Sequence, residues 1–365
     1  MTFFNKKNKL RKKEYIMFKN SYKLFLVPLL VFSLNSSDTL SKSGFVAFVS
    51  NQTSQTISDF FPSTITFENQ VPASNDSSII IQKHNHEANS IKYISTAINT
   101  STESFGIAGK RVNDEITYIN DFKGKVRYSA SSESNLSPIP NIYETKQPIT
   151  TIGKLTGTLD SKTFQGSCFI LPNGYIMTAA HCVYIDGNYI RNLYVNFEYI
   201  KAGKFKIVES YLPKAWVDSN PTFNTSYPTT EQKNNDWAIL KIADTTQLSV
   251  YGSTTIFTNS DFSGDEYIAI GYPQGGSLKY SKGYGTISQT EYRYDLNTYV
   301  TGGMSGGPLI AYFTEWDERI QETLRYIGVI GIISTSEPDY PSNNSWTGVT
   351  RITNTMLTFI DRFGQ

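Results

Sequence analysis

The sequence predicts an all-β fold of short antiparallel strands that ends in one short helix. Segments rich in Val, Ile, Tyr and Phe recur between turn signals, for example at 204–208 and 266–270. After Thr353 and Asn354, which form a suitable N-cap, apolar residues return at helical spacing instead. The roughly 220 residues from 145 to 365 are enough for one domain with a sizeable core.

Residues 1–36 have the pattern of a signal peptide. They contain eight Lys or Arg residues and one Glu, and the apolar run 24–34 follows the basic part. A basic segment before about a dozen apolar residues is typical of a secretory leader and is short for a membrane span. No cysteine follows the run, which excludes a bacterial lipoprotein anchor, while the lack of an Ala-x-Ala motif leaves an uncleaved membrane anchor open. We therefore expect a secreted, extracellular protein.

The charge of the chain excludes one class of partner. The whole chain has a formal net charge of +1, and residues 1–36 alone contribute +7 (eight basic residues less one Glu), so the rest is weakly acidic. A weakly acidic protein lacks the electrostatic footprint of nucleic-acid binding. We expect no nucleic-acid partner, and no membrane partner once the leader is removed.

Residues 37–144 predict a propeptide or a loosely ordered N-terminal region. They are rich in Ser, Thr and Asn, lack long apolar runs and contain no cysteine. A strand-like piece occurs at 78–81. His84 and His86 have no third candidate ligand nearby, so a solvated loop is favoured over a metal site. A processing cut is expected near 137–140.

The stretch 301–308, Thr-Gly-Gly-Met-Ser-Gly-Gly-Pro, presents Ser305 on a tight glycine-rich turn. Glycine permits positive φ and lets a substrate carbonyl come close to the backbone. The N–H groups of Gly303 and Ser305 are candidates for an oxyanion hole, in which the loss of one donor typically costs about 100- to 1,000-fold in rate. The pattern predicts a nucleophilic serine.

A nucleophilic serine needs a base near neutral pH, and His181 is the candidate. The chain has three histidines, and only His181 lies in the same domain as Ser305. Between them, Asp236 opens an apolar strand, where a half-buried carboxylate would hold an imidazole in one tautomer. Asp186 and Asp218 compete for this role, but neither opens such a strand. The candidate residues therefore follow one another in the order His, Asp, Ser.

This order matches the chymotrypsin-type peptidases and differs from subtilisin and the α/β-hydrolases. Over about residues 145–365 the chain resembles trypsin-fold serine peptidases, and within them bacterial glutamyl endopeptidases of the staphylococcal and Bacillus type. The first likeness is carried by three motifs, at 178–182, 236–240 and 303–308. The second is carried by three others, at 271–273, 294–296 and 348–353.

The resemblance implies a chymotrypsin-like fold of two six-stranded antiparallel β-barrels, with the C-terminal helix packed on the second. It implies a serine endopeptidase in which Ser305 attacks, His181 moves the proton and Asp236 orients the imidazole, through an acyl-enzyme. It also implies protein or peptide substrates, a monomeric state, and neither a metal nor an organic cofactor.

The resemblance further pairs Cys168 with Cys182 in a disulfide, which an oxidising compartment permits. The alternative is two buried thiols in a cytosolic chain. Met304 stands where trypsin-like zymogens carry an aspartate that pairs with a newly cut N-terminus. A methionine cannot form that ion pair, so any activation by cleavage must work in another way.

Four residues correspond to the S1 pocket of the family, which takes the side chain before the scissile bond (P1): Tyr299, Thr301, Ile333 and Ser334. Tyr299 stands where trypsin-like enzymes carry an aspartate, and Ile333 where glutamyl endopeptidases carry a histidine. An isoleucine cannot hydrogen-bond a Glu carboxylate, and an unpaired buried charge is costly. A preference for Glu and a preference for a medium or large uncharged P1 side chain both stay open.

Two other classes of function stay open as well. One is a catalytically idle relative that binds a partner protein through its barrel surface. The other is a surface protein whose residues 37–140 carry the biology, with the peptidase domain acting only in self-processing.

Overall fold

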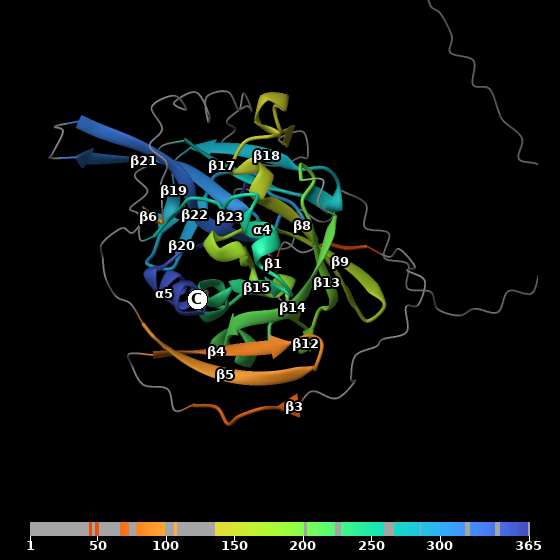
Figure 1. Cartoon of the computed structure of the whole chain (residues 1–365). Coiled ribbons are helices and arrows are strands. Elements are labelled where there is room, and N and C mark those ends of the chain that lie inside the picture. Colours follow the sequence, from red (N-terminus) through yellow and green to blue (C-terminus); the bar gives the residue numbers. More distant parts are fainter. Residues whose placement is uncertain are drawn as a thin grey trace, which may run out of the picture.

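The computed structural model describes residues 44–45, 48–50, 66–72, 78–98, 106–107, 136–200, 203–222, 228–258, 266–284, 286–317, 322–339 and 344–363. These residues form two large β-sheets and a few short helices (Figure 1). None of their helices is long and apolar enough to cross a membrane. The leader expected at 1–36 lies outside the described residues.

The first sheet contains a closed six-stranded antiparallel barrel. Its strands are β8 (Ile152–Leu159), β9 (Lys162–Ile170), β10 (Ile176–Thr178), β13 (Arg191–Asn196), β14 (Lys204–Pro213) and β15 (Ala238–Ile242). They pair in the order β13-β8-β9-β10-β15-β14, and a pairing between β13 and β14 closes the ring. The side chains of β8 mostly alternate between buried and partly exposed, as expected of a strand with one face in a core.

The second sheet also returns on itself. Seven of its eleven strands form the ring: β17 (Glu266–Gly271), β18 (Lys279–Tyr284), β19 (Thr286–Gln289), β20 (Arg293–Leu296), β21 (Pro308–Asp317), β22 (Glu322–Asp339) and β23 (Asn344–Arg351). Their order is β19-β20-β23-β22-β21-β17-β18, so β19 and β18 stand at the two ends of this order. Along the chain, a single residue separates β18 from β19. Counted as one interrupted strand, β18 and β19 complete a second six-stranded barrel. The predicted fold of two antiparallel barrels is therefore confirmed.

The helices of the described residues are short: α2 (Lys214–Asp218), α3 (Thr230–Asn235), α4 (Thr246–Ser249) and α5 (Asn354–Phe363). The C-terminal helix α5 begins where the sequence predicts, and Thr353 Oγ1 accepts the N–H of Met356 at 3.4 Å. Phe359 of α5 packs against Tyr211 of β14, with 5.5 Å between their ring centroids. The helix expected on the second barrel therefore contacts a strand of the first.

An N-terminal hairpin extends the first sheet. β4 (Ser78–Asn85) and β5 (Ser90–Ala97) pair along their whole length, and β4 also pairs with residues 209–213 of β14 (Figure 1). The loose order expected for this region does not hold for the hairpin. The hairpin is ordered by a tertiary contact. The part of β14 that extends beyond β13 has a free edge, and its backbone groups form hydrogen bonds with β4.

The hairpin buries two histidines that were expected in a solvated loop. His84 lies on β4 and His86 directly after it in the turn, and they are 3% and 8% exposed. The ring of His84 stacks on Tyr189 of β12 (Asn188–Tyr189) at 3.8 Å between centroids, and Gln82 Nε2 donates to Tyr189 Oη at 2.7 Å. His86 Nε2 lies 3.1 Å from Ser210 Oγ of β14. Among the described residues, no group of three or more His, Cys, Asp and Glu side chains is placed to hold a metal ion.

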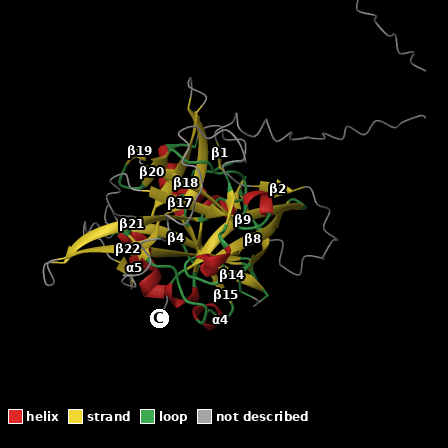
Figure 2. Cartoon of the chain, turned by 90° about the horizontal axis from the view of Figure 1, so that it is seen from above, coloured by secondary structure: helices red, strands yellow, loops and turns green. Residues whose placement is uncertain are grey.

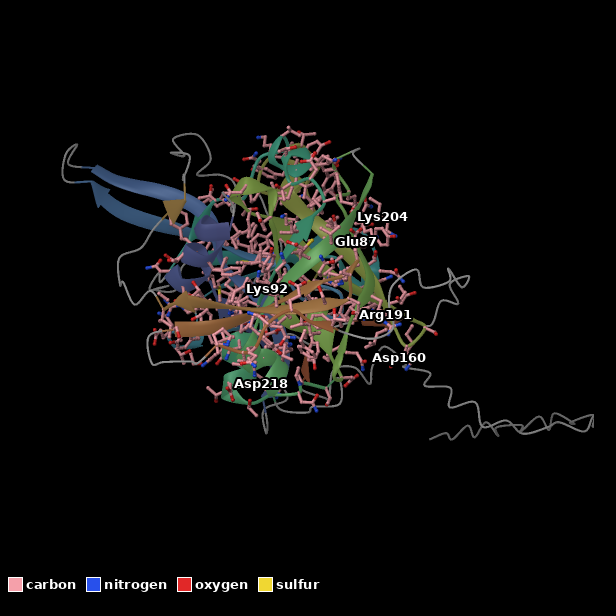
Figure 3. The ribbon with its side chains drawn as sticks, turned by 60° about the horizontal axis from the view of Figure 1, so that its bottom comes forward. Glu87, Lys92, Asp160, Arg191, Lys204 and Asp218 are labelled. Carbon is pink, nitrogen blue, oxygen red and sulfur yellow. The ribbon has the colours of Figure 1, made fainter. Side chains whose placement is uncertain are left out.

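Charged side chains add contacts along the same edge. Lys206 Nζ lies 3.2 Å from Glu87, which is in the turn of the hairpin. Figure 3 labels Glu87 close to Lys204. Lys83 Nζ lies 2.6 Å from Glu209. Such partly exposed ion pairs contribute about 0–1 kcal/mol each, so the buried aromatic contacts and the backbone pairing hold most of the hairpin.

Four shorter strands precede the barrels: β1 (Gly44–Phe45), β2 (Phe48–Ser50), β6 (Gly106–Ile107) and β7 (Ser137–Pro138). They pair with β22, β9, β16 (Ile256–Phe257) and β18 respectively, and Figure 2 labels β2 beside β9. A fifth, β3 (Thr66–Phe67), pairs with β5. The cut expected near 137–140 would thus fall in a paired strand next to the buried Ile139.

Candidate active site

The strand pairing of the first barrel brings His181 and Asp236 together. Thr178 at the end of β10 faces Ala238 at the start of β15. His181 follows β10 on a 3-10 turn, Ala180–Cys182, and Asp236 precedes β15 directly after helix α3. Two residues that lie 55 positions apart in the chain are therefore in contact.

The Asp236 carboxylate fixes His181 by its ring and by its backbone. Oδ2 lies 2.8 Å from Nδ1, and Oδ1 accepts the backbone N–H of His181 at 2.9 Å. Ser334 Oγ donates to Oδ2 at 2.5 Å. All three side chains are fully buried. With Nδ1 facing the carboxylate, the ring presents Nε2 on its far side, as a general base requires.

The charge of Asp236 also governs the ionisation of His181. Burial by itself disfavours the imidazolium, yet the adjacent carboxylate raises the pKa of His181 above its ordinary value. An imidazolium formed during a reaction is thereby stabilised. Trp216 packs beside this pair, with its ring centroid 6.5 Å from that of His181, and its Nε1 donates to Tyr184 O at 3.0 Å.

Ser305 lies on a turn whose backbone favours glycine. Gly303 and Gly306 have φ values of +91° and +81°, which side chains disfavour. A Cβ added to Gly306 would clash with the end of β10, so the turn packs directly on the segment that leads to His181. The carbonyl of Ser305 accepts the N–H of Ser167 at 2.7 Å. Ser305 is thus held between β9 and the turn that carries His181.

Two hydrogen bonds fix the peptide groups on either side of Gly303. The carbonyl of Gly302 accepts the N–H of Gln274 at 2.6 Å, and the carbonyl of Gly303 accepts the hydroxyl of Ser167 at 2.7 Å. In a trans peptide the N–H points opposite to the preceding C=O. The N–H of Gly303, predicted as an oxyanion donor, therefore points away from Gln274 in a fixed direction.

The hydrogen bonds of Ser167 direct its hydroxyl proton to a single acceptor, the carbonyl of Gly303. The backbone N–H of Tyr272 donates to Oγ at 2.9 Å, which leaves the O–H to donate to Gly303. The carbonyl of Ser167 accepts Thr178 Oγ1 at 2.7 Å. Sequence reasoning missed this residue, because its hydroxyl partners lie 105 and 136 positions away and no local motif reports such contacts.

Met304 anchors the same turn by apolar contact. It is fully buried in the core of the second barrel, in a cluster with Val300, Leu309 and Val349. The position at which trypsin-like zymogens carry an ionisable group is therefore filled by the core. Met304 itself has no ionisable group that could pair with a chain terminus.

The predicted disulfide is absent, because Cys168 and Cys182 are both free and buried. Cys168 Sγ faces the carbonyl of Gly153 at 3.4 Å, whereas Cys182 Sγ faces the carbonyl of Ser305 at 3.6 Å. Burial raises the pKa of the Cys168 thiol. A Cβ added at Gly166 would lie 3.5 Å from the Cβ of Cys182, a separation typical of disulfides. The position suited to bridge Cys182 is therefore a glycine.

The four residues predicted for the S1 pocket have different surroundings. Tyr299 is 5% exposed, and the carbonyl of Thr301 accepts the N–H of Met304 at 3.0 Å. Ile333 is fully buried in the core cluster of the second barrel. Ser334, predicted only for the pocket, is a hydrogen-bond partner of Asp236.

One stretch of the chain is similar to a known family of domains. Residues 166–314 match a family model described as a trypsin-like peptidase domain, and this stretch holds His181, Asp236 and Ser305. No curated protein matches the sequence. A solved Glu endopeptidase is 17% identical, with 62% of this chain and 95% of that one covered at a TM-score of 0.45. The protease Anisep from Arthrobacter nicotinovorans is 20% identical, with 60% and 96% covered at a TM-score of 0.43. Residues 166–314 are therefore similar to trypsin-like peptidase domains.

Proposed function

We propose that this chain is a secreted serine endopeptidase with Ser305 as nucleophile, His181 as general base and acid, and Asp236 as the carboxylate that orients the imidazole. The observation that carries the proposal is the buried contact of 2.8 Å between His181 and Asp236 inside a trypsin-like peptidase domain. The glycine-rich turn that presents Ser305 supports it. The substrates are proteins or peptides, and the protein acts as a monomer.

The mechanism follows from these roles. Ser305 Oγ attacks the scissile carbonyl carbon while His181 Nε2 takes its proton, and His181 then gives the proton to the leaving amine. A water molecule, activated by the same imidazole, hydrolyses the acyl-enzyme. The N–H groups of Gly303 and Ser305 stabilise the oxyanion, and the fixed direction of the Gly303 N–H supports this role.

For P1 we propose a medium or large uncharged side chain. The buried Ile333 offers no polar group to a P1 carboxylate. The guanidinium of Arg293, which donates to Thr335 Oγ1 at 2.7 Å beside Ser334, already pairs with Asp295 at 2.6 Å. Matched peptides with Val, Gln or Glu at P1 test this, and we expect the lowest kcat/KM for Glu. A preference for Glu over Gln of more than about 10-fold would overturn it.

The nucleophile is tested with a fluorophosphonate probe and intact-mass measurement. We expect one adduct on the wild-type chain and none on a Ser305→Ala variant of unchanged melting temperature. The mass of the unlabelled protein also locates the N-terminus of the secreted form. A folded wild-type chain that takes no adduct and hydrolyses no peptide would contradict the proposal and favour the catalytically idle, partner-binding alternative.

A further inference from the structure

Residues 272–276 form a loop, the support loop, that follows β17 and contacts the glycine-rich turn of the nucleophile. The N–H of Gln274 donates to the carbonyl of Gly302 at 2.6 Å. A Cβ added to Gly303 would lie 2.4 Å from the carbonyl oxygen of Tyr272 and 2.9 Å from the nitrogen of Gln274, so only a glycine fits there. The position of the Gly303 N–H, the proposed oxyanion donor, therefore depends on where the support loop lies.

The backbone of the support loop needs contacts from outside to keep its shape. Gln274 has a φ of +50°, in the left-handed region that residues with a side chain disfavour. Such a conformation persists where the surroundings fix it. Inside the loop, the carbonyl of Tyr272 accepts the N–H of Gly275, and that of Pro273 accepts the next N–H. The carbonyls of Gly275 and Gly276 accept hydrogen bonds from a side chain of the first barrel.

That side chain is Lys154 of β8. Its Nζ donates to the carbonyl of Gly275 at 2.9 Å and to that of Gly276 at 3.4 Å. The same Nζ lies 5.5 Å from the centroid of the Tyr272 ring. Hydrogen bonds from a charged donor are roughly twice as strong as neutral ones, and the face of an aromatic ring attracts a cation. Lys154 thus contacts both ends of the support loop.

A second residue of the first barrel holds the same region. Ser167 stands directly opposite Lys154 in the pairing of β8 with β9, so the two side chains lie on one face of the sheet. Ser167 Oγ accepts the N–H of Tyr272 and donates to the carbonyl of Gly303. Two paired residues of the first barrel therefore fix the backbone of the second barrel around the proposed oxyanion donor.

We infer that Lys154 is a positioning residue for the proposed reaction: its ammonium group fixes the support loop, and the loop fixes the peptide group that directs the Gly303 N–H to the oxyanion. This inference rests on the proposed function. Lys154 acts through residues 272–276 and does not touch the substrate in this role. Removal of its charge should therefore weaken binding of the transition state more than binding of the substrate.

The test is steady-state kinetics of the full-length chain on an uncharged peptide substrate. Lys154→Met keeps the alkyl stem and removes the charged donor. We expect kcat to fall about 10- to 100-fold, with a change in KM of less than about threefold. Lys154→Arg keeps a charged donor and should retain most of the wild-type kcat. Lys154→Gln, with a shorter and neutral donor, should fall between the two. Thermal unfolding curves ensure that each variant is compared at an equal folded fraction.

Lys83 of β4 provides the matched control. Its Nζ lies 2.6 Å from Glu209 and 5.7 Å from the centroid of the Tyr211 ring, so it has a polar partner and an aromatic neighbour as Lys154 does. Lys83→Met should lower the melting temperature without lowering kcat. If it lowers kcat as much as Lys154→Met does, the loss reflects stability alone and the inference is wrong. Equal losses for Lys154→Met and Lys154→Arg would also overturn it, because the charged donor would then have no part.

A peptide boronic acid gives a second readout. Its boron bonds to Ser305 Oγ and becomes tetrahedral and negatively charged, as the reacting centre does in the transition state. We expect Lys154→Met to bind it more weakly than the wild type, by about the factor lost in kcat/KM. Equal boronate affinities would overturn the inference. A wild type that hydrolyses no peptide and binds no boronate would instead contradict the proposed function, whereas an active wild type with an equally active Lys154→Met variant contradicts this inference alone.

Discussion

At the scale of single residues, Ser167 is the least obvious part of the candidate site. Its hydroxyl donates to the carbonyl of Gly303 and so helps to hold the peptide group whose N–H is the proposed oxyanion donor. We predict that Ser167→Ala lowers kcat about 10- to 100-fold with little change in KM, because a displaced donor weakens transition-state binding more than substrate binding. Steady-state kinetics on an uncharged peptide substrate measures the split.

The control for this prediction is another buried hydroxyl. Thr254 Oγ1 lies 2.7 Å from Thr151 Oγ1, away from the nucleophile turn, so Thr254→Val removes a comparable hydrogen bond. It should lower the melting temperature without lowering kcat. Ser167→Cys, which keeps the shape but is a weaker donor, should fall between wild type and Ser167→Ala. A wild-type kcat for Ser167→Ala would rule out this role.

The position best placed to form a disulfide with Cys182 is Gly166. This interpretation can be tested by introducing a cysteine there. We predict that Gly166→Cys bridges to Cys182 in air and raises the free energy of unfolding by roughly 3 kcal/mol, as expected for a loop of this length. Non-reducing mass spectrometry of the alkylated protein measures the bridge. The double variant Gly166→Cys/Cys182→Ala should show neither effect, and a free thiol at 166 in the single variant would contradict the geometry.

At the scale of elements, the β4–β5 hairpin predicts a pH dependence of stability. Burial lowers the pKa of His84 from 6.5 to about 4, and it lowers that of His86 as well, with help from His84 and Lys206. Both stay neutral in the folded protein, while the unfolded chain takes up protons below about pH 6.5. The free energy of unfolding should therefore fall as the pH drops from 6.5 to 4, by about 3 kcal/mol from His84 alone.

Urea unfolding of Ser305→Ala at pH 7, 5.5 and 4.5 measures this slope without self-digestion. His181 is the same in both proteins of the comparison that follows, so any contribution from it cancels. The matched control is Ser305→Ala with His84→Gln and His86→Gln, which should be less stable at pH 7 yet show a flatter slope. Equal slopes would mean that His84 and His86 are protonated in the folded protein as readily as in the unfolded chain, which would contradict the prediction.

The elements also show what local patterns reveal and what they miss. The strand-like run at 78–81 and the helical spacing after Asn354 both report structure that forms where it was predicted. The docking of the hairpin was not predictable, because it depends on the free edge of β14, more than a hundred residues away in the chain. Composition alone made the same residues resemble a disordered propeptide.

At the scale of the whole molecule, the two-barrel fold was expected from the resemblance of the three motifs to those of trypsin-fold peptidases, and the recurring short strands agree with it. The contact between His181 and Asp236 was foreseen for the same reason, since each residue sits in a recognisable local motif. The roles of Ser167 and Gly166 could not be foreseen. Both depend on how β9 of the first barrel packs against the turn that carries Ser305 in the second. These contacts join residues far apart in the chain, so no local sequence pattern indicates them.

The pairing of β4 with β14 makes part of the N-terminal region a part of the folded protein. A chain that begins at residue 66 keeps the hairpin on β14, whereas one that begins at 136 loses it. The shorter chain would expose the face of Tyr189 on which His84 stacks and the edge of β14 that β4 covers. We predict that its melting temperature falls by about 10 °C or more, since a few kcal/mol shift the midpoint of a domain of this size by that much. Thermal unfolding followed by circular dichroism, with Ser305→Ala in both chains, measures the difference. If the two chains melt together, the hairpin is a removable propeptide after all, and residues 37–144 would be lost on maturation as their composition first suggested.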